Sequence, residues 1–121
     1  MASAFRKAVE AHDADAMAAA LDPDVTFRSP IVFQTYEGRD AVMHLLRAVG
    51  EVFEDFRYVD ELHGEHTTAL VFQARVGDRE LEGVDHLRHG PDGLVTELMV
   101  MVRPYSAATA LRDAMGAKLA A

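Results

Sequence analysis

One acidic residue within an apolar stretch is the strongest candidate for chemistry in this sequence. Asp85 lies among apolar residues and glycine in the segment Leu81–Arg103, which reads LEGVDHLRHGPDGLVTELMVMVR. A carboxyl group buried without a cation either keeps its proton, because its pKa rises, or binds hydrogen-bond donors. Asp85 is therefore a candidate acid, base or polar anchor for a ligand. The structural alternative is a carboxylate that accepts hydrogen bonds from Ser29, Tyr36 or a loop amide and only fastens the fold.

The histidines show no metal-binding pattern. A zinc site needs three or four convergent ligands, and no two histidines are spaced with a carboxylate on one face of a predicted helix. His89 shares the predicted strand face of Asp85, but four residues along a strand span about 13 Å, which is too far for a direct pair. We expect no metal site, and surface or interface positions for His12, His44, His63, His66, His86 and His89.

Two further sets of residues depend on neighbours that the sequence does not identify. Asp60 and Glu61 lie on a predicted strand whose register is not fixed, so either side chain can face inward, although a solvated edge is favoured. Ser29 would act as a nucleophile only with a base beside it. There is no glycine-rich phosphate-binding loop, and we expect no cofactor.

The composition excludes several classes of partner. The 121 residues suffice for a single domain, 1–121, with one core. The net charge of −8 argues against nucleic acid and against an anionic membrane surface, since both need a clustered basic face. The chain has no cysteine, and its first residues lack an apolar run long enough for a signal peptide or a membrane span. We therefore expect a cytoplasmic protein.

The apolar pattern predicts helices early in the chain and strands later. Apolar residues three and four positions apart predict helices, alternation predicts strands, and glycine and proline separate them. Ile31, Val32, Phe33 and Tyr36 make the predicted loop 30–37 unusually apolar, which indicates that it folds over something. The predicted helices cover 3–11, 14–21, 38–53 and 107–119, and the predicted strands cover 25–29, 56–63, 67–76, 79–89 and 94–103.

This order of elements and one tight turn predict where Asp85 points. Helices followed by a block of strands indicate an α+β fold, here a cone-shaped, curved antiparallel sheet wrapped around the helix 38–53, the longest of the chain. The turn Gly77-Asp78 fixes the register of the strands that it joins, and opposite residues share a face. Leu70 then lies opposite Asp85. The apolar inner face of these two strands carries Leu70, Phe72, Ala74, Leu81, Gly83, Asp85 and Leu87.

The last strand predicts a contact with a second chain. Leu98, Val100 and Val102 alternate with Met99 and Met101, so both faces of this strand are partly apolar. Two methionines on an outer sheet face favour a homodimer through that face. The alternative is that the last helix covers them.

Three stretches of the sequence resemble the nuclear transport factor 2-like superfamily, in particular its ketosteroid isomerase and SnoaL-like polyketide cyclase branches. They read HDADAMAAALDPDVTFRSP, EGRDAVMHLLRAV and VDHLRHGPDGLVTELMVMV, and the resemblance covers nearly the whole chain. It implies a cystatin-like α+β barrel, usually dimeric, with an apolar pocket between sheet and helices. The same scaffold hosts many chemistries and also non-catalytic binders.

The resemblance implies a role for Asp85 and leaves other family roles unfilled. In ketosteroid isomerases the aspartate that matches Asp85 is a protonated hydrogen-bond donor in an oxyanion hole. The general-base aspartate of that family falls at Ser29 and its tyrosine at about Phe5, so typical ketosteroid isomerase activity is not expected. Limonene epoxide hydrolases need an arginine where this chain has Gly83, together with a second aspartate near the end of the chain that it lacks.

We expect a small dimeric protein with an apolar pocket for a small, mostly hydrophobic molecule. If it is an enzyme, Asp85 would act as acid or base in a cofactor-free isomerisation, cyclisation or dehydration. The alternative is a non-catalytic ligand-binding or dimerisation module, and a protein–protein adaptor would need an exposed apolar patch beyond the dimer face. The residues expected around the ligand are Phe27, Ser29, Ile31, Phe33, Tyr36, Leu70, Phe72, Leu87, Leu98, Val100 and Val102.

Overall fold

Four helices and six strands make up the fold in the computed structural model, which describes residues 3–120. All four helices and the four C-terminal strands lie within two residues of their predicted bounds. In chain order the elements are α1 (Ala4–Glu10), α2 (Ala14–Ala20), β1 (Leu21–Arg28), β2 (Thr35–Glu37), α3 (Arg39–Val52), β3 (Glu54–His63), β4 (Thr67–Val76), β5 (Arg79–His89), β6 (Val95–Arg103) and α4 (Tyr105–Ala120).

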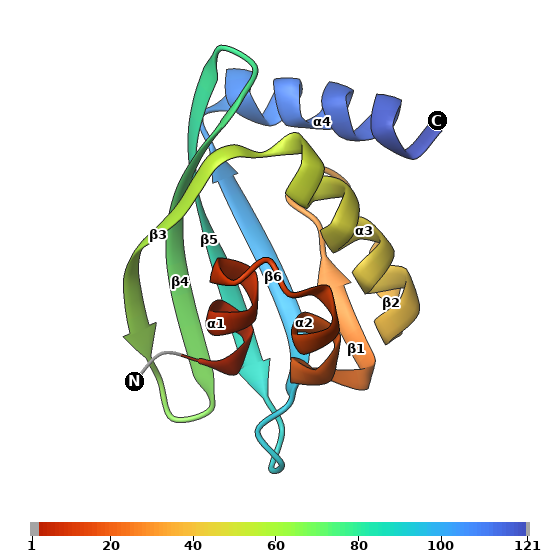
Figure 1. The fold of residues 1–121 in the computed structure, drawn as a ribbon, viewed down its shortest axis with the longest axis vertical. Helices are drawn as coiled ribbons and strands as arrows, with labels where there is room; N and C mark the ends of the chain where they lie inside the picture. The colour runs from red at the N-terminus through yellow and green to blue at the C-terminus, as the bar shows by residue number, and fades with distance from the viewer. Residues whose placement is uncertain (1–2, 121) are drawn as a thin grey trace.

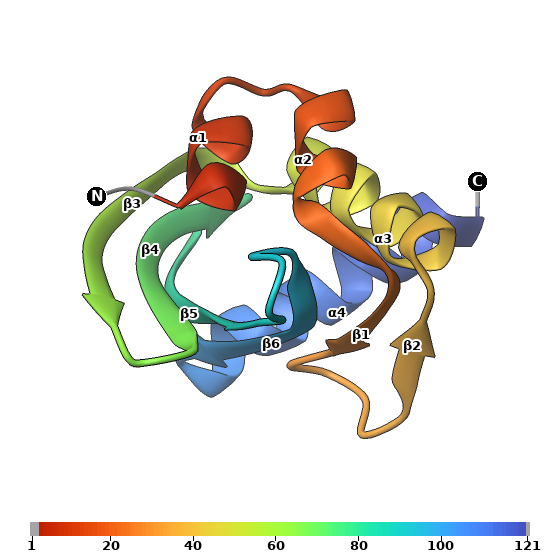
Figure 2. The same cartoon turned by 90° about the horizontal axis from the view of Figure 1, so that it is seen from below.

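A single six-stranded sheet, in the order β2-β1-β6-β5-β4-β3, curves around an interior (Figure 1). Figure 2 shows α1, α2 and α3 on the concave side of this sheet. Neighbouring strands are antiparallel except for β1 and β6, which pair in parallel with Phe27 opposite Leu98. The fold is α+β as predicted, but the sheet is mixed, and the prediction of a purely antiparallel sheet is wrong for this pair.

The first two helices begin where a polar side chain caps them. The Ser3 hydroxyl accepts a hydrogen bond from the Arg6 backbone N–H at 3.0 Å, and the Asp13 carboxylate accepts one from Ala16 at 3.0 Å. Such caps satisfy N–H groups that the first helical turn leaves without partners. They fix where α1 and α2 begin, and so which side chains these helices turn toward the sheet.

The two longer helices close the interior. α3 begins after Gly38, whose φ of 95° lies in the region that favours glycine. α4 packs against α3 and against β4, β5 and β6, and it crosses one end of the sheet in Figure 1. It has 16 residues against 14 for α3, so the prediction that α3 is the longest helix is wrong. No helix within the described range is long and apolar enough to cross a membrane.

The predicted register of β4 and β5 is confirmed. Leu70 lies opposite Asp85, and Phe72 lies opposite Gly83. β6 continues the same face, with Val100 on the other side of Asp85. Because Asp85 is only 9% exposed, its predicted position on the buried inner face is also confirmed.

The edge strand β3 does not alternate simply. Its register against β4 shifts between Glu54 and Arg57 and again between Tyr58 and Asp60. Such irregularities insert residues on one strand and re-aim the side chains that follow. As a result Tyr58 and Glu61, three positions apart, both lie opposite buried residues of β4.

The first strand is longer than predicted. β1 starts at Leu21, directly after α2, rather than at Val25. Thr35–Glu37, within the predicted loop, form β2 and pair with β1 so that Tyr36 lies opposite Phe27. This pairing holds the returning loop beside the interior.

The outer face of β6 is open. Met101 is 53% exposed. The α4 side chains Leu111 and Met115 line the interior instead, so the structure does not support the alternative in which the last helix covers Met99 and Met101. The outer face is therefore accessible in a single copy of the chain.

Candidate functional site

A cavity of about 580 Å³ lies between the sheet and the helices. This volume is in the range of small-molecule pockets. All elements except β4 contribute to its mostly apolar lining, which is formed by Phe5, Val9, His12, Met17, Phe27, Ser29, Pro30, Ile31, Val32, Tyr36, Leu45, Leu46, Val49, Gly50, Phe53, Asp55, Phe56, Tyr58, Asp85, Leu98, Val100, Leu111, Arg112, Met115 and Leu119.

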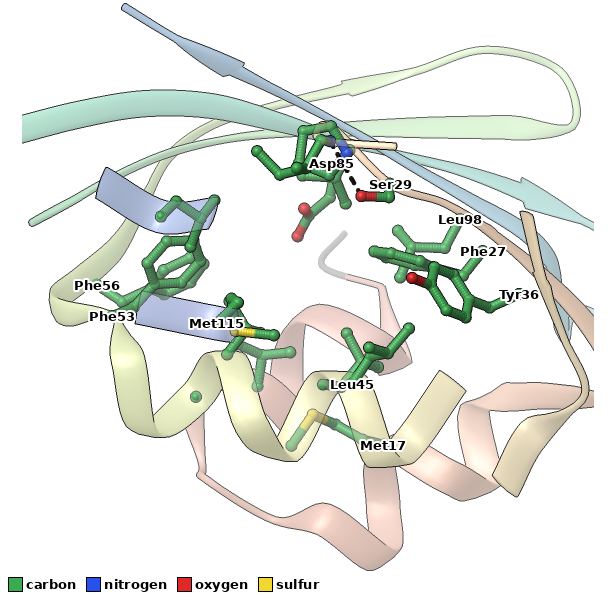
Figure 3. Close-up of a pocket in the computed structure, with 18 of the residues that line it drawn as sticks. Met17, Phe27, Ser29, Tyr36, Leu45, Phe53, Phe56, Asp85, Leu98 and Met115 are labelled. Carbon is green, nitrogen blue, oxygen red and sulfur yellow. Dashed lines mark hydrogen bonds between the residues drawn. The ribbon is translucent and has the colours of Figure 1, made fainter. Parts of the chain in front are cut away.

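The Asp85 carboxyl group points from β5 into this cavity (Figure 3). The Tyr58 hydroxyl donates a hydrogen bond to its Oδ2 atom at 2.8 Å, and no other hydrogen-bond partner of this carboxyl lies within residues 3–120. Burial raises the pKa of Asp85 to about 7, and the Tyr58 hydrogen bond opposes this rise only in part. Near neutral pH, both the protonated and the ionised form of Asp85 are therefore populated.

Tyr58 is the functional residue that the sequence analysis missed. It is 8% exposed and comes from β3, whose register was not predictable. Burial, and then the nearby Asp85 charge, raise the pKa of its phenol, so the hydroxyl keeps its proton and remains a donor. Phe5, which falls at about the position of the tyrosine of ketosteroid isomerases and has no hydroxyl, lines the cavity. The alternation of Phe56 and Tyr58 was the available signal that both face inward.

One wall of the cavity is aromatic. Phe53 and Phe56 stack with ring centres 5.6 Å apart, and Phe56 stacks on Phe72 at 5.0 Å. Gly83 makes this possible, because a β-carbon there would overlap the Phe72 ring and approach the Met101 backbone oxygen to 2.6 Å. Figure 3 shows Phe53 and Phe56 on one side of Asp85. The wall offers a rigid, flat surface beside the carboxyl group.

Ser29 and Tyr36 do not bind Asp85. The Ser29 hydroxyl accepts hydrogen bonds from the backbone N–H groups of Ile31 at 3.0 Å and Val32 at 3.3 Å. Tyr36 packs against Phe27, with ring centres 6.2 Å apart. The predicted hydrogen bonds from these two residues to Asp85 are therefore wrong, although both side chains line the cavity.

The structure divides the predicted pocket residues into three groups. Phe27, Ser29, Ile31, Tyr36, Leu98 and Val100 line the cavity. Leu70, Phe72 and Leu87 are at most 1% exposed and form the core behind the lining. The prediction is wrong for Phe33 and Val102, which do not line the cavity: Phe33 is 100% exposed, and Val102, opposite Gly83, packs against the core.

The remaining polar candidates lie outside the Asp85–Tyr58 pair. Within residues 3–120, no group of three or more histidine and acidic side chains could hold a metal ion. His12 lines the cavity but is exposed. Asp60 is exposed, whereas the Glu61 side chain is only 9% exposed and forms an ion pair with Arg6 at 3.0 Å. The favoured interpretation, a solvated edge, is wrong for Glu61.

Comparison with known proteins gives a consistent result. The SnoaL-like domain family matches residues 2–98. A steroid delta-isomerase from Pseudomonas aeruginosa is 39% identical, with a TM-score of 0.92 over 96% of this chain and 86% of that chain. An uncharacterized protein with a cystatin-like fold from Silicibacter pomeroyi is 37% identical, with a TM-score of 0.91 over 97% of this chain and 83% of that chain.

More distant structures share the fold alone. A nuclear transport factor 2-like protein of unknown function from Mesorhizobium loti is 18% identical, with a TM-score of 0.72 over 83% of this chain and 85% of that chain. No curated protein matches the sequence. The family match covers most of the chain, and the steroid delta-isomerase has the same fold over nearly all of it. The chain therefore belongs to the SnoaL-like domain family, among the nuclear transport factor 2-like and ketosteroid isomerase-like proteins.

Proposed function

We propose that the cavity binds a small, mostly apolar molecule through one of its oxygen atoms, and that Asp85 moves a proton to or from this molecule. The reaction class is a cofactor-free isomerisation, cyclisation or dehydration. The observation that carries the proposal is a buried carboxyl group that faces a cavity of about 580 Å³ with Tyr58 as its hydrogen-bond donor. A pKa of about 7 suits a group that must both give and take protons near neutral pH.

A single carboxyl group can complete such a proton transfer. As the carboxylate, Asp85 takes a proton from a carbon next to a carbonyl group, and the electron pair of that C–H bond moves onto the carbonyl oxygen. As the acid, Asp85 returns the proton to another carbon or to a leaving hydroxyl, which departs as water. Tyr58 donates to Oδ2 throughout, which leaves Oδ1 free to face the ligand.

The steroid delta-isomerase from Pseudomonas aeruginosa supports the isomerase branch of this proposal, since it shares 39% of its residues with this chain. The three-residue arrangement of ketosteroid isomerases does not support steroid isomerisation here. Ser29 stands at the position of the base, and its hydroxyl accepts two backbone hydrogen bonds. Phe5 stands at the position of the tyrosine.

A non-catalytic binding protein is the second candidate. It is favoured by the same Ser29 position, because a serine hydroxyl without a base is a poor proton acceptor. In this case the protonated Asp85 would serve only as a hydrogen-bond donor to a ligand oxygen.

The experiment uses 2-tetralone, a flat bicyclic ketone with exchangeable protons next to its carbonyl, and tetralin, which lacks the oxygen. Calorimetry measures binding of each, and NMR in D2O measures exchange of the 2-tetralone protons. We expect 2-tetralone to bind about tenfold or more tightly than tetralin, because it alone pairs with the buried carboxyl. We expect the protein to accelerate exchange.

Two variants separate the candidates. Asp85→Asn keeps a donor but has no acidic proton, so it should bind 2-tetralone within a few-fold and lose exchange by about a hundredfold or more. Asp85→Leu should bind both compounds equally. Binding without any exchange in the natural chain would favour the binding protein, and equal binding of both compounds by the natural chain would contradict the proposal.

We also propose that a second copy of the chain covers the outer face of β6. Phe33, Val32 and Met101 are exposed beside one shallow groove there. Charges of both signs flank the groove, in the Arg28–Glu97 and Arg103–Glu82 pairs. An apolar centre with balanced charges is self-complementary under a two-fold axis.

Sedimentation velocity tests this pairing. The chain should sediment as a dimer, and Met101→Glu should shift it to a monomer, because a carboxylate would be buried between the copies. Leu62→Glu is the control, since Leu62 is similarly exposed, at 54%, on the edge strand β3. A natural chain that remains monomeric at about 100 µM would contradict the pairing.

A further inference from the structure

A second polar cluster lies directly behind the Asp85–Tyr58 pair. The Arg6 guanidinium, from α1, has its central carbon 5.6 Å from the centre of the Tyr58 ring. Its Nη1 atom donates to Glu61 Oε1 at 3.0 Å, and its Nε atom lies 3.4 Å from Glu10. Arg6 is therefore held by a hydrogen bond to Glu61 and attracted by the nearby charge of Glu10, while its cation faces the tyrosine ring.

Glu61 makes this cluster more than a surface ion pair. Its side chain is 9% exposed and that of Arg6 is 23% exposed. The second carboxylate oxygen of Glu61 lies 2.6 Å from the Nε2 atom of His63. The register shifts of β3 turn Glu61 inward beside Tyr58. A charged pair therefore lies where a well-packed apolar pair would often give equal or greater stability.

Tyr58 is held from two sides. Arg6 lies over its ring, and the Phe56 ring meets it edge-on, with centres 5.0 Å apart and an angle of 85°. A tyrosine side chain turns about two bonds, and contacts on both sides of the ring restrict that rotation. The direction of the hydroxyl toward Asp85 at 2.8 Å thus depends on these neighbours.

We infer that Arg6 is a positioning residue for the buried acid: held by Glu61, it clamps the Tyr58 ring so that the hydroxyl stays on Asp85. The cation also withdraws electron density from the ring and makes the phenol a stronger donor. The inference rests on the proposed function, because holding Tyr58 against Asp85 is useful only if Asp85 gives and takes a proton.

The test is the pKa of Asp85, measured by carboxyl-carbon NMR titration in the natural chain, Arg6→Met and Arg6→Lys. Arg6→Met removes both clamp and cation, and should raise the Asp85 pKa by roughly 0.5–1 pH unit. Arg6→Lys keeps the charge without the planar group and should give a smaller rise. Arg28→Met is the control, since Arg28 pairs with Glu97 away from the cavity and should leave this pKa unchanged.

The same Arg6→Met change in a Tyr58→Phe background separates positioning from charge. If Arg6 acts through the tyrosine hydroxyl, its removal should change the Asp85 pKa little when that hydroxyl is absent. An equal rise in both backgrounds would overturn the inference, and so would a lower melting temperature with an unchanged pKa. If Arg6→Met does not fold, the comparison is made with Arg6→Lys in both backgrounds.

The same titration can contradict the proposed function independently of the role of Arg6. A pKa of Asp85 near its ordinary value of about 4 in the natural chain would contradict the proposed function itself. A raised pKa in the natural chain that does not respond to Arg6 would contradict only the role of Arg6.

Discussion

Glu82 and Asp85 lie three residues apart on β5 and meet opposite surroundings. Glu82, on the outer face, accepts hydrogen bonds from Gln73 at 3.2 Å and from Arg103 at 2.5 Å, and these two partners lower its pKa. Asp85, on the inner face, has Tyr58 as its partner and a pKa of about 7. Successive strand residues face opposite sides of the sheet, so two residues an odd number of positions apart lie on different faces.

The difference shows that the strand face, rather than the type of side chain, sets the acidity. The Gln73 amide and Arg103 stabilise the charge of Glu82, while burial penalises the charge of Asp85. The inner face therefore holds a carboxyl group at the expense of stability, which is what we expect of a residue retained for function.

The largest effect should come from Asp85→Asn. The folded-state pKa of Asp85 is raised above its unfolded value, so the folded state holds a proton that the unfolded state has lost. This contribution to stability is fully present below about pH 4, is lost as pH rises toward 7, and changes no further above it. Removing the ionisable group should raise the free energy of unfolding at pH 8 by roughly 2–4 kcal/mol.

Urea unfolding of both chains between pH 4 and pH 9 measures this difference. The two chains should be similar at pH 4 and diverge toward pH 7. A difference in stability between the two chains that stays constant from pH 5 to pH 8 would show that Asp85 is ionised throughout this range, with a pKa that is not raised.

Gly83→Ala should remove the packing that distinguishes the inner face. The added β-carbon would overlap the Phe72 ring and the Met101 backbone oxygen, and we expect a loss of roughly 1–3 kcal/mol in the free energy of unfolding. Gly116→Ala is the matched control, because no atom lies within 4 Å of its β-carbon position. In α4 it should stabilise the chain by up to about 1 kcal/mol. A neutral Gly83→Ala would mean that the aromatic wall can move.

Tyr58→Phe should sharpen the contrast by removing the hydrogen bond that the Tyr58 hydroxyl donates to Asp85. The pKa of Asp85 should rise further, and the chain should lose about 1–2 kcal/mol at pH 8, where the carboxylate needs that donor. The loss should be smaller at pH 5, where Asp85 is protonated. Urea unfolding at the two pH values measures both, and equal losses would place the effect in packing.

Glu82→Gln should have the smallest effect. Its side chain is 46% exposed and its ion pair with Arg103 is exposed as well. Exposed pairs contribute little, so the melting temperature should change by less than about 2 °C from pH 5 to 9. A larger change, measured by circular dichroism, would show that the Gln73, Glu82 and Arg103 contacts act as one network.

The sequence predicted the Asp85 environment because the information was local. The Gly77-Asp78 turn sets the pairing of two neighbouring strands, and simple alternation then assigns Leu70 and Asp85 to one face. The same reasoning could not assign Tyr58 to a face, because β3 contains two register shifts and no turn residue in the sequence marks them. A one-residue slip reverses every side chain beyond it.

Distance along the chain explains the errors in the predicted sheet. The parallel pairing of β1 with β6 joins segments that share no turn, so neither the mixed sheet nor the start of β1 at Leu21 has a local signal.

Phe33 was placed in the pocket because it is aromatic and lies in an apolar loop, yet its side chain is 100% exposed. Hydrophobicity alone does not say which of two faces a loop residue joins.

The parallel pair also has a consequence for folding kinetics. β4, β5 and β6 pair with strands next to them in sequence, whereas Leu21 meets Val95 across 95 − 21 = 74 positions. Contacts of such separation require closure of a long loop and slow the formation of a fold. The cavity is complete only when β1 has paired with β6. A bound ligand should therefore slow unfolding of the closed cone, while leaving the rate of folding nearly unchanged.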